Sequence, residues 1–141
     1  MPEFILPENI APFFARVLLG ILFLMQGYDK IFHIKITNVV ETIKPAYSKL
    51  KLPGFVITLG AYFTSYVELI CGLFLITGLL KYFSLYLLGI DLLIVSFSMS
   101  VMNPVWNMQH VFPRFVLLLF LLIYPAEFDV ITMRNLFSLF K

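Results

Sequence analysis

The chain has little of what a water-soluble protein uses for its surface. Of its 141 residues only 13% are charged, whereas 61% are hydrophobic, and the mean hydropathy is +0.97. This composition leaves too little polar surface to coat a soluble globule of this size. The net charge of +2 is also too small to favour nucleic acid as a partner. The sequence therefore indicates an integral membrane protein whose first partner is the lipid bilayer.

Cysteine and histidine are scarce, and their scarcity excludes several redox chemistries. Cys71 is the single cysteine, so the chain has no internal thiol–disulfide couple and cannot hold a cofactor with two thiolates. His33 and His110 lie at the margins of hydrophobic stretches, without the spacing of a haem or metal site. We therefore expect no metal or haem, and we interpret Cys71 as a small packing residue.

Four hydrophobic stretches are long enough to cross a bilayer as helices, which takes roughly 20 residues each. They cover about residues 10–32, 55–80, 82–102 and 111–130. Almost no loop separates the second stretch from the third, so these two helices are expected to be antiparallel neighbours. We predict an all-α fold in which residues 1–141 form one membrane domain, a four-transmembrane-helix up-down bundle.

The longest polar segment, about residues 33–52, joins the first two predicted helices. Its apolar residues recur at helical spacing, so we expect an amphipathic segment that lies at the membrane interface. The segment also carries four lysines, Lys35, Lys44, Lys49 and Lys51. Positive charge favours the cytoplasmic side, which predicts a cytoplasmic first loop and external termini.

Ionisable side chains lie inside the hydrophobic stretches, where each charge costs about 2.5 to 3.5 kcal/mol on insertion scales. These residues are Arg16, Asp29, Lys30, Glu68, Asp91 and Arg114. A chain that keeps such charges must pair or hydrate them, and intramembrane charges are usually tied to function. They are therefore the candidate functional residues.

The spacing of these residues predicts which face of each helix they share and how deep in the bilayer each one lies. Arg16 and Lys30 share one face of the first helix with Gly20 and Gly27, and they lie about 21 Å apart at about 1.5 Å per residue. Glycines on such a face let a neighbouring backbone come close. In the second helix, Glu68 falls near the bilayer midplane and requires an internal partner.

Depth also predicts which charges meet. Arg16 is expected to lie near the level of Asp91 and Glu68 and to pair with one of them. On the opposite side of the bundle, Arg114 and Lys30 are expected to form a second layer with Asp29, His33 and His110. The first layer is either a buried ion network that fixes helix packing or a proton relay through one of its acids.

Two segments resemble the helices of DoxX-type membrane proteins. Residues 16–30, with Arg16, Gly20, Gly27 and Lys30, are similar to the opening helix of that family. Residues 66–80, with Glu68, Gly72 and Gly78, are similar to its second helix. Asp91 and Arg114 are proposed from depth alone and do not come from the resemblance.

The resemblance implies a small four-helix protein of the bacterial inner membrane. Some relatives are described as the small subunit of a thiosulfate:quinone oxidoreductase, and others as partners in membrane oxidoreductase complexes. On this basis we expect a subunit of a quinone-linked redox complex, which acts with a protein partner and is not catalytic alone. Glu68 and Asp91 are the candidate catalytic residues; the candidate quinone-binding residues are Arg16, Gln26, Lys30 and Arg114; the candidate helix-packing residues are Gly20, Gly27, Gly72 and Gly78.

Two other functions stay open at this point. One is a non-catalytic assembly or scaffold subunit, in which the buried charges fix helix packing and the basic first loop docks a partner. The other is a small proton or solute pathway. The sequence shows no pair of broken helices and no inverted repeat, which makes the pathway the weaker alternative. For any of these functions, the partner is either another protein or a second copy of this chain, as a homo-oligomer.

Overall fold

The structure is a computed structural model that describes residues 6–48, 51–102, 108–129 and 131–132. In these ranges the regular elements are all helical. The first helix, α1, spans Pro7–Tyr28 and begins with a proline at its first position, where the missing N–H has no partner to lose. It continues into a π-helical turn, Asp29–His33. Such turns are rare and are frequently found at functional sites.

The helix α2 spans Ile36–Tyr47 and occupies the segment predicted to be amphipathic. Its inward face packs on the start of α3, where Val40 belongs to a small core cluster with Ile57 and Ala61. At its end the Tyr47 hydroxyl donates a hydrogen bond to Ser98 Oγ in α4 at 2.7 Å. The helix α2 is thereby fastened to both of its neighbours.

The helices α3 and α4 form the antiparallel pair that the sequence predicts. They span Gly54–Thr77 and Lys81–Met102, and only residues 78–80 separate them. Gly78 ends α3 in the left-handed conformation, at φ +74°. Glycine is the residue that adopts this conformation without steric penalty, and it commonly ends helices for that reason.

The last helix, α5, is shorter than predicted. It spans Phe112–Ile123, and a short 3₁₀ turn, Ala126–Phe128, follows. Twelve residues rise only about 18 Å, against about 30 Å of hydrocarbon. The expected continuous helix over 111–130 is therefore wrong in length, because Pro125 holds the preceding Tyr124 in extended backbone at φ −69° and ψ 127°.

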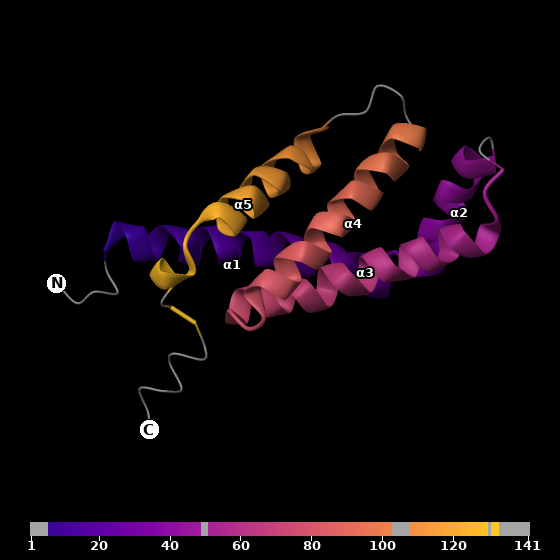
Figure 1. The fold of residues 1–141 in the computed structure, drawn as a ribbon. Coiled ribbons are helices and arrows are strands. Elements are labelled where there is room, and N and C mark those ends of the chain that lie inside the picture. The colour runs from indigo at the N-terminus through magenta and orange to yellow at the C-terminus, as the bar shows by residue number, and fades with distance from the viewer. Residues whose placement is uncertain (1–5, 49–50, 103–107, 130, 133–141) are drawn as a thin grey trace.

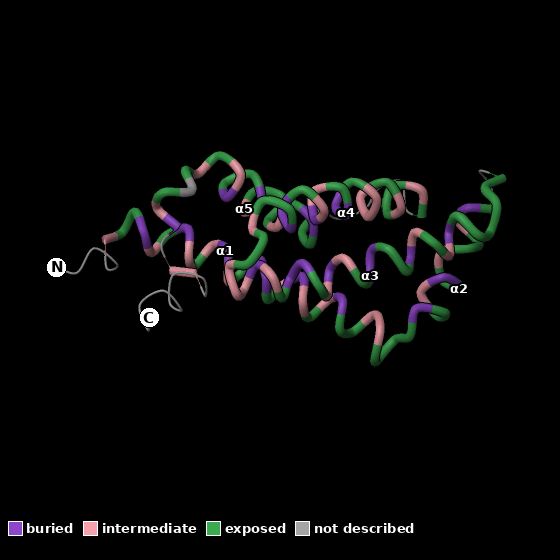
Figure 2. Tube along the Cα trace, turned by 60° about the horizontal axis from the view of Figure 1, so that its bottom comes forward, coloured by how far each residue is buried: buried purple, intermediate pink, exposed green. Residues whose placement is uncertain are grey.

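Three helical segments are long and apolar enough to cross a membrane, and α5 is a shorter apolar helix. The helices α1 and α3 run side by side, while α4 and α5 lie together on one side of that pair (Figure 1). Buried positions follow the sides of the helices that face one another, and exposed positions follow the outer sides (Figure 2). The main apolar core lies between α1, α3, α4 and α5.

Candidate functional site

Small residues bring the backbones of α1 and α3 into direct contact. A Cβ atom added to Gly27 would lie 2.5 Å from the backbone nitrogen of Leu69, and one added to Gly72 would lie 2.6 Å from that of Leu24. A Cβ atom added to Gly20 would lie 2.8 Å from the Gly72 carbonyl oxygen. At separations this short, a side chain at these positions would force the neighbouring backbone to shift. The close contact places the polar residues of the two helices within hydrogen-bonding reach.

Glu68 receives two hydrogen bonds from α1. Its side chain is fully buried, and its Oε1 atom accepts from the Lys30 ammonium at 2.7 Å and from the Gln26 amide at 2.8 Å. The Lys30 side chain is itself 17% exposed. The ion pair therefore connects a carboxylate in the core with the surface of the helix assembly.

Asp91 faces Glu68 from the neighbouring helix. Each acid lies about ten residues from the turn between α3 and α4, so the antiparallel pair brings them to one level. The two carboxyl groups are close enough for the charge of one to act on the other. Glu68 Oε2 and both Asp91 oxygens are buried without a hydrogen-bond donor among the described residues.

Arg114 approaches the two acids from the start of α5. Its guanidinium carbon lies 5.7 Å from the centre of the Phe23 ring, and its charge acts on both Glu68 and Asp91. Within the described part of the chain it makes no hydrogen bond or ion pair. A positive charge at a helix N-terminus opposes the helix dipole, so the nearby acids are what favour it there. We call Gln26, Lys30, Glu68, Asp91 and Arg114 the central cluster.

Arg16 belongs to a different polar group. It is fully buried, and its Nη1 atom donates to the carbonyl oxygens of Leu75 and Ile76, two of the last residues of α3. Its Nη2 atom donates to the carbonyl oxygen of Ile131 at 2.6 Å. The terminal carbonyls of a helix have no partner within the helix and carry partial negative charge. The Arg16 guanidinium thus caps α3 from the side of α1.

Asp129 completes this second group. It lies 3.3 Å from Arg16 Nε and 3.0 Å from the Lys81 ammonium at the start of α4, and its side chain is 3% exposed. Gly78 lies against the same guanidinium, since a Cβ atom there would meet Arg16 Nη1 at 2.9 Å. We call Arg16, Lys81 and Asp129 the terminal cluster. It joins α1, the α3–α4 turn and the segment after α5.

These contacts correct the predicted pairing. The expected contact of Arg16 with Glu68 or Asp91 is wrong, because each of its three nitrogens is engaged in the terminal cluster. Lys30 and Arg114 instead join the two acids. The expected second layer is also wrong, since Asp29 and His33 pair with each other at 2.8 Å on the surface and His110 is exposed.

From the sequence, no site role is predicted for Asp129 or for Lys81. Asp129 lay inside the presumed fourth transmembrane helix and was not singled out. Pro125 was the available signal, because a proline ends or bends a helix and would have placed Asp129 beyond it. Among the described residues, no three His, Cys, Asp or Glu side chains gather as metal ligands would.

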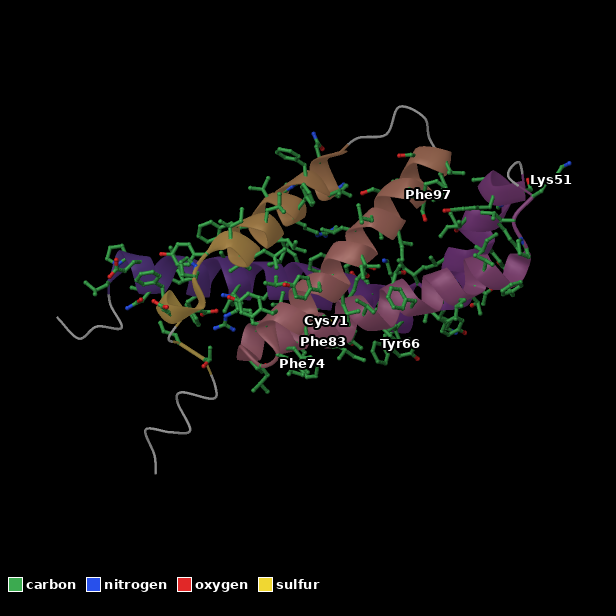
Figure 3. All side chains as sticks on the ribbon, viewed as in Figure 1. Lys51, Tyr66, Cys71, Phe74, Phe83 and Phe97 are labelled. Carbon is green, nitrogen blue, oxygen red and sulfur yellow. The ribbon has the colours of Figure 1, made fainter. Side chains whose placement is uncertain are left out.

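The outer side of α3 and α4 carries an apolar groove of about 420 Å³. Aromatic side chains and Cys71 line it, among them Tyr66 and Phe83, which Figure 3 labels. On α3, Tyr66 and Ile70 are each two residues from Glu68, a rotation of about 200° around the helix axis. The groove therefore opens away from the central cluster.

The fold and the two buried clusters together define a helical integral membrane protein that keeps charges inside its core. The comparisons name the family. The model of the DoxX family matches residues 11–100, which is more than half of the chain, and the chain belongs to this family. This confirms the resemblance found in the sequence. The match ends before Arg114 and Asp129. Neither the comparison with curated proteins nor that with solved structures gave a match.

Proposed function

We propose that this chain is a small subunit of a quinone-linked redox complex in the bacterial inner membrane, and that Glu68 and Asp91 handle its protons. The observation that carries the proposal is the buried carboxyl pair of the central cluster. Two acids that share one proton can release or accept it with little movement. Intramembrane acids of this kind serve proton transfer in many membrane proteins.

The donors around the pair suit a quinone carbonyl. A quinone supplies two-electron, two-proton redox chemistry when it is bound. Arg114 is the best-placed donor, because its guanidinium is half-buried and makes no hydrogen bond among the described residues. Lys30 and Gln26 hold Glu68 in place through its Oε1 atom. We leave Arg16 out of the proposed site, since its donors are already engaged.

We further propose that the four helices form an up-down bundle across the bilayer, with α2 at the interface on the cytoplasmic side and the termini outside. The lysines around α2 support this orientation, since Lys35, Lys44 and Lys51 are exposed. The chain has no pair of thiolates for a redox centre of its own, so a partner subunit would supply the electrons.

The test is a Glu68→Gln variant in the complex purified from native membranes. We expect the variant to insert and assemble as the wild type does, and to lose most quinone-dependent turnover, because glutamine keeps the size of the side chain but cannot exchange a proton. Glu41→Gln, on the exposed side of α2, is the matched control and should keep full activity. Equal turnover in the Glu68→Gln variant and the wild type would remove Glu68 from proton transfer.

A non-catalytic assembly role is the alternative that the terminal cluster favours, since Arg16, Lys81 and Asp129 serve packing. It predicts the opposite result. Activity would survive the neutral isostere at Glu68, whereas assembly would fail when the exposed residues of α2 are altered. Recovery of the chain from native membranes with neither quinone nor a redox partner would also favour it.

A further inference from the structure

A layer of leucines separates the two polar clusters. The layer is made of fully buried leucines from α1, α3, α4 and α5, and we call it the leucine layer. Its members are Leu19, Leu75, Leu85, Leu88 and Leu121. All five belong to the same core cluster. These leucines therefore pack together between α1, α3, α4 and α5.

The helix register places the layer between the clusters. In α1, Leu19 lies about 5 Å from Arg16 and about 11 Å from Gln26 along the axis. In α4, Leu88 lies between Lys81 and Asp91, about 5 Å before the acid. Ser84 is the one buried hydroxyl at this height, and its Oγ atom has no hydrogen-bond partner among the described residues. The buried Cys71 thiol lies beside Ser84. One hydroxyl and one weakly polar thiol do not bridge the gap between the two clusters.

The two sides of the layer differ in how far their charged groups are buried. On the terminal side, the Asp129 carboxylate is 3% exposed and both of its cations are engaged with it. On the α2 side, Lys30 is 17% exposed and Arg114 is half-buried, and these are the charged groups that face the acids from α1 and α5. Apolar constrictions of this kind exclude water and ions, whereas polar groups favour their entry.

We propose that the Glu68–Asp91 pair exchanges protons with one side of the membrane, the side on which α2 lies, and that the leucine layer closes the other. The inference rests on the proposed proton handling by this pair. The inference specifies the side of the membrane with which the acids exchange protons, because protons enter and leave past Lys30 and Arg114. It also means that the chain is no through pathway for protons.

The test compares two leucines of α4 on either side of Asp91. Leu88→Asn places a polar group inside the layer, whereas Leu92→Asn places the same group just beyond the acid, at a site that is 3% exposed. Proton flux into proteoliposomes after an external pH step is read with an enclosed pH-sensitive dye. We expect wild type and Leu92→Asn to match protein-free vesicles, and Leu88→Asn to raise the flux on the order of tenfold.

Adding Asp91→Asn to Leu88→Asn should return the flux to the wild-type level, because the path then lacks its acid. Flux through the wild type, equal flux in both asparagine variants, or no rise in Leu88→Asn would each overturn the inference. Monodisperse elution and an unchanged thermal midpoint establish that a variant is folded. Leu19→Asn, in the same layer, replaces Leu88→Asn where the latter does not fold.

A measurement on the unsubstituted chain makes the inference independent of folding in the variants. The infrared carbonyl band of a protonated carboxyl group, identified by its loss in Asp91→Asn, is followed in vesicles of known protein orientation. A pH step on the α2 side should change the band, and a step on the terminal side should not. A response from the terminal side would contradict the inference, while the Glu68→Gln assay above tests the proposed function separately.

Discussion

The two buried clusters of this protein use their polar groups in different ways. In the terminal cluster every nitrogen of Arg16 reaches an acceptor, and Asp129 lies between two cations. Lys81 Nζ and Asp129 Oδ2 make no aligned hydrogen bond among the described residues, but they form an ion pair at 3.0 Å. In the central cluster three carboxyl oxygens lack a donor and Arg114 makes no hydrogen bond or ion pair within the described ranges. Buried polar groups are normally satisfied because an unpaired one is costly. The terminal cluster therefore stabilises the fold, and the central cluster is where function is expected.

Substitution of Arg16 should have the largest effect on stability. Arg16→Met keeps an apolar chain of similar length but leaves Asp129 and the end of α3 without their donor. Removing one partner of a buried ion pair costs about 3 to 5 kcal/mol. Denaturant unfolding in detergent measures the loss. Arg114→Met is the matched substitution in the central cluster, where the arginine makes no hydrogen bond among the described residues. An equal loss of stability in Arg114→Met would contradict the contrast between the two clusters.

Gly27→Ala should have a smaller effect than Arg16→Met. It tests the backbone contact that brings Lys30 and Gln26 to Glu68, because the new methyl group would meet Leu69 backbone atoms at 2.5 and 2.9 Å. Overpacking of this kind costs about 1 to 3 kcal/mol. Thermal unfolding in detergent gives the size of the effect. Gly60→Ala is the control, since no atom lies within 4 Å of the new Cβ there. A similar loss at Gly60 would show that helix packing is not the cause.

Some of this arrangement could be predicted from the sequence, since hydropathy alone locates α1, α3 and α4. The recurrence of Gly20, Gly27 and Lys30 on one face also predicts where a neighbour comes close. These features are local, and they follow from the helical repeat.

The partners of Arg16 could not be predicted in the same way. They depend on where α5 ends and how the chain after it returns to the α3–α4 turn. The prediction of ion pairs from bilayer depth takes residues 111–130 as one straight helix. With that helix, Glu68 and Asp91 are the acids nearest to Arg16. Pro125 shortens the helix, and Asp129 becomes the acid that Arg16 meets.

Tyr47→Phe should have a smaller effect that reports on α2. The change removes the hydrogen bond to Ser98 while keeping the ring in its buried site. A single hydrogen bond of this kind contributes about 0.5 to 1.5 kcal/mol. Faster hydrogen exchange in α2, with α1 and α3 unchanged, is the expected result. Equal changes in all three helices would mean that α2 is not a separately anchored element.

The last comparison sets Asp91→Asn against Asp129→Asn, the same substitution in the two clusters. Asp129→Asn removes the charge that two cations share, and should destabilise the protein by about 3 kcal/mol or more. Asp91→Asn should leave the stability unchanged or raise it, because the new amide can donate to Glu68 Oε2, which has no donor in the described residues.

Unfolding measurements on both variants, together with turnover of the complex, separate the two roles. Loss of turnover without loss of stability at Asp91 would match a residue that is kept for its chemistry, since functional residues are often held in arrangements that do not favour the fold. A destabilised Asp91→Asn variant would instead mean that the carboxylate has partners that hold the helices together. The contrast between the clusters would then disappear, and the central cluster would be a second packing device.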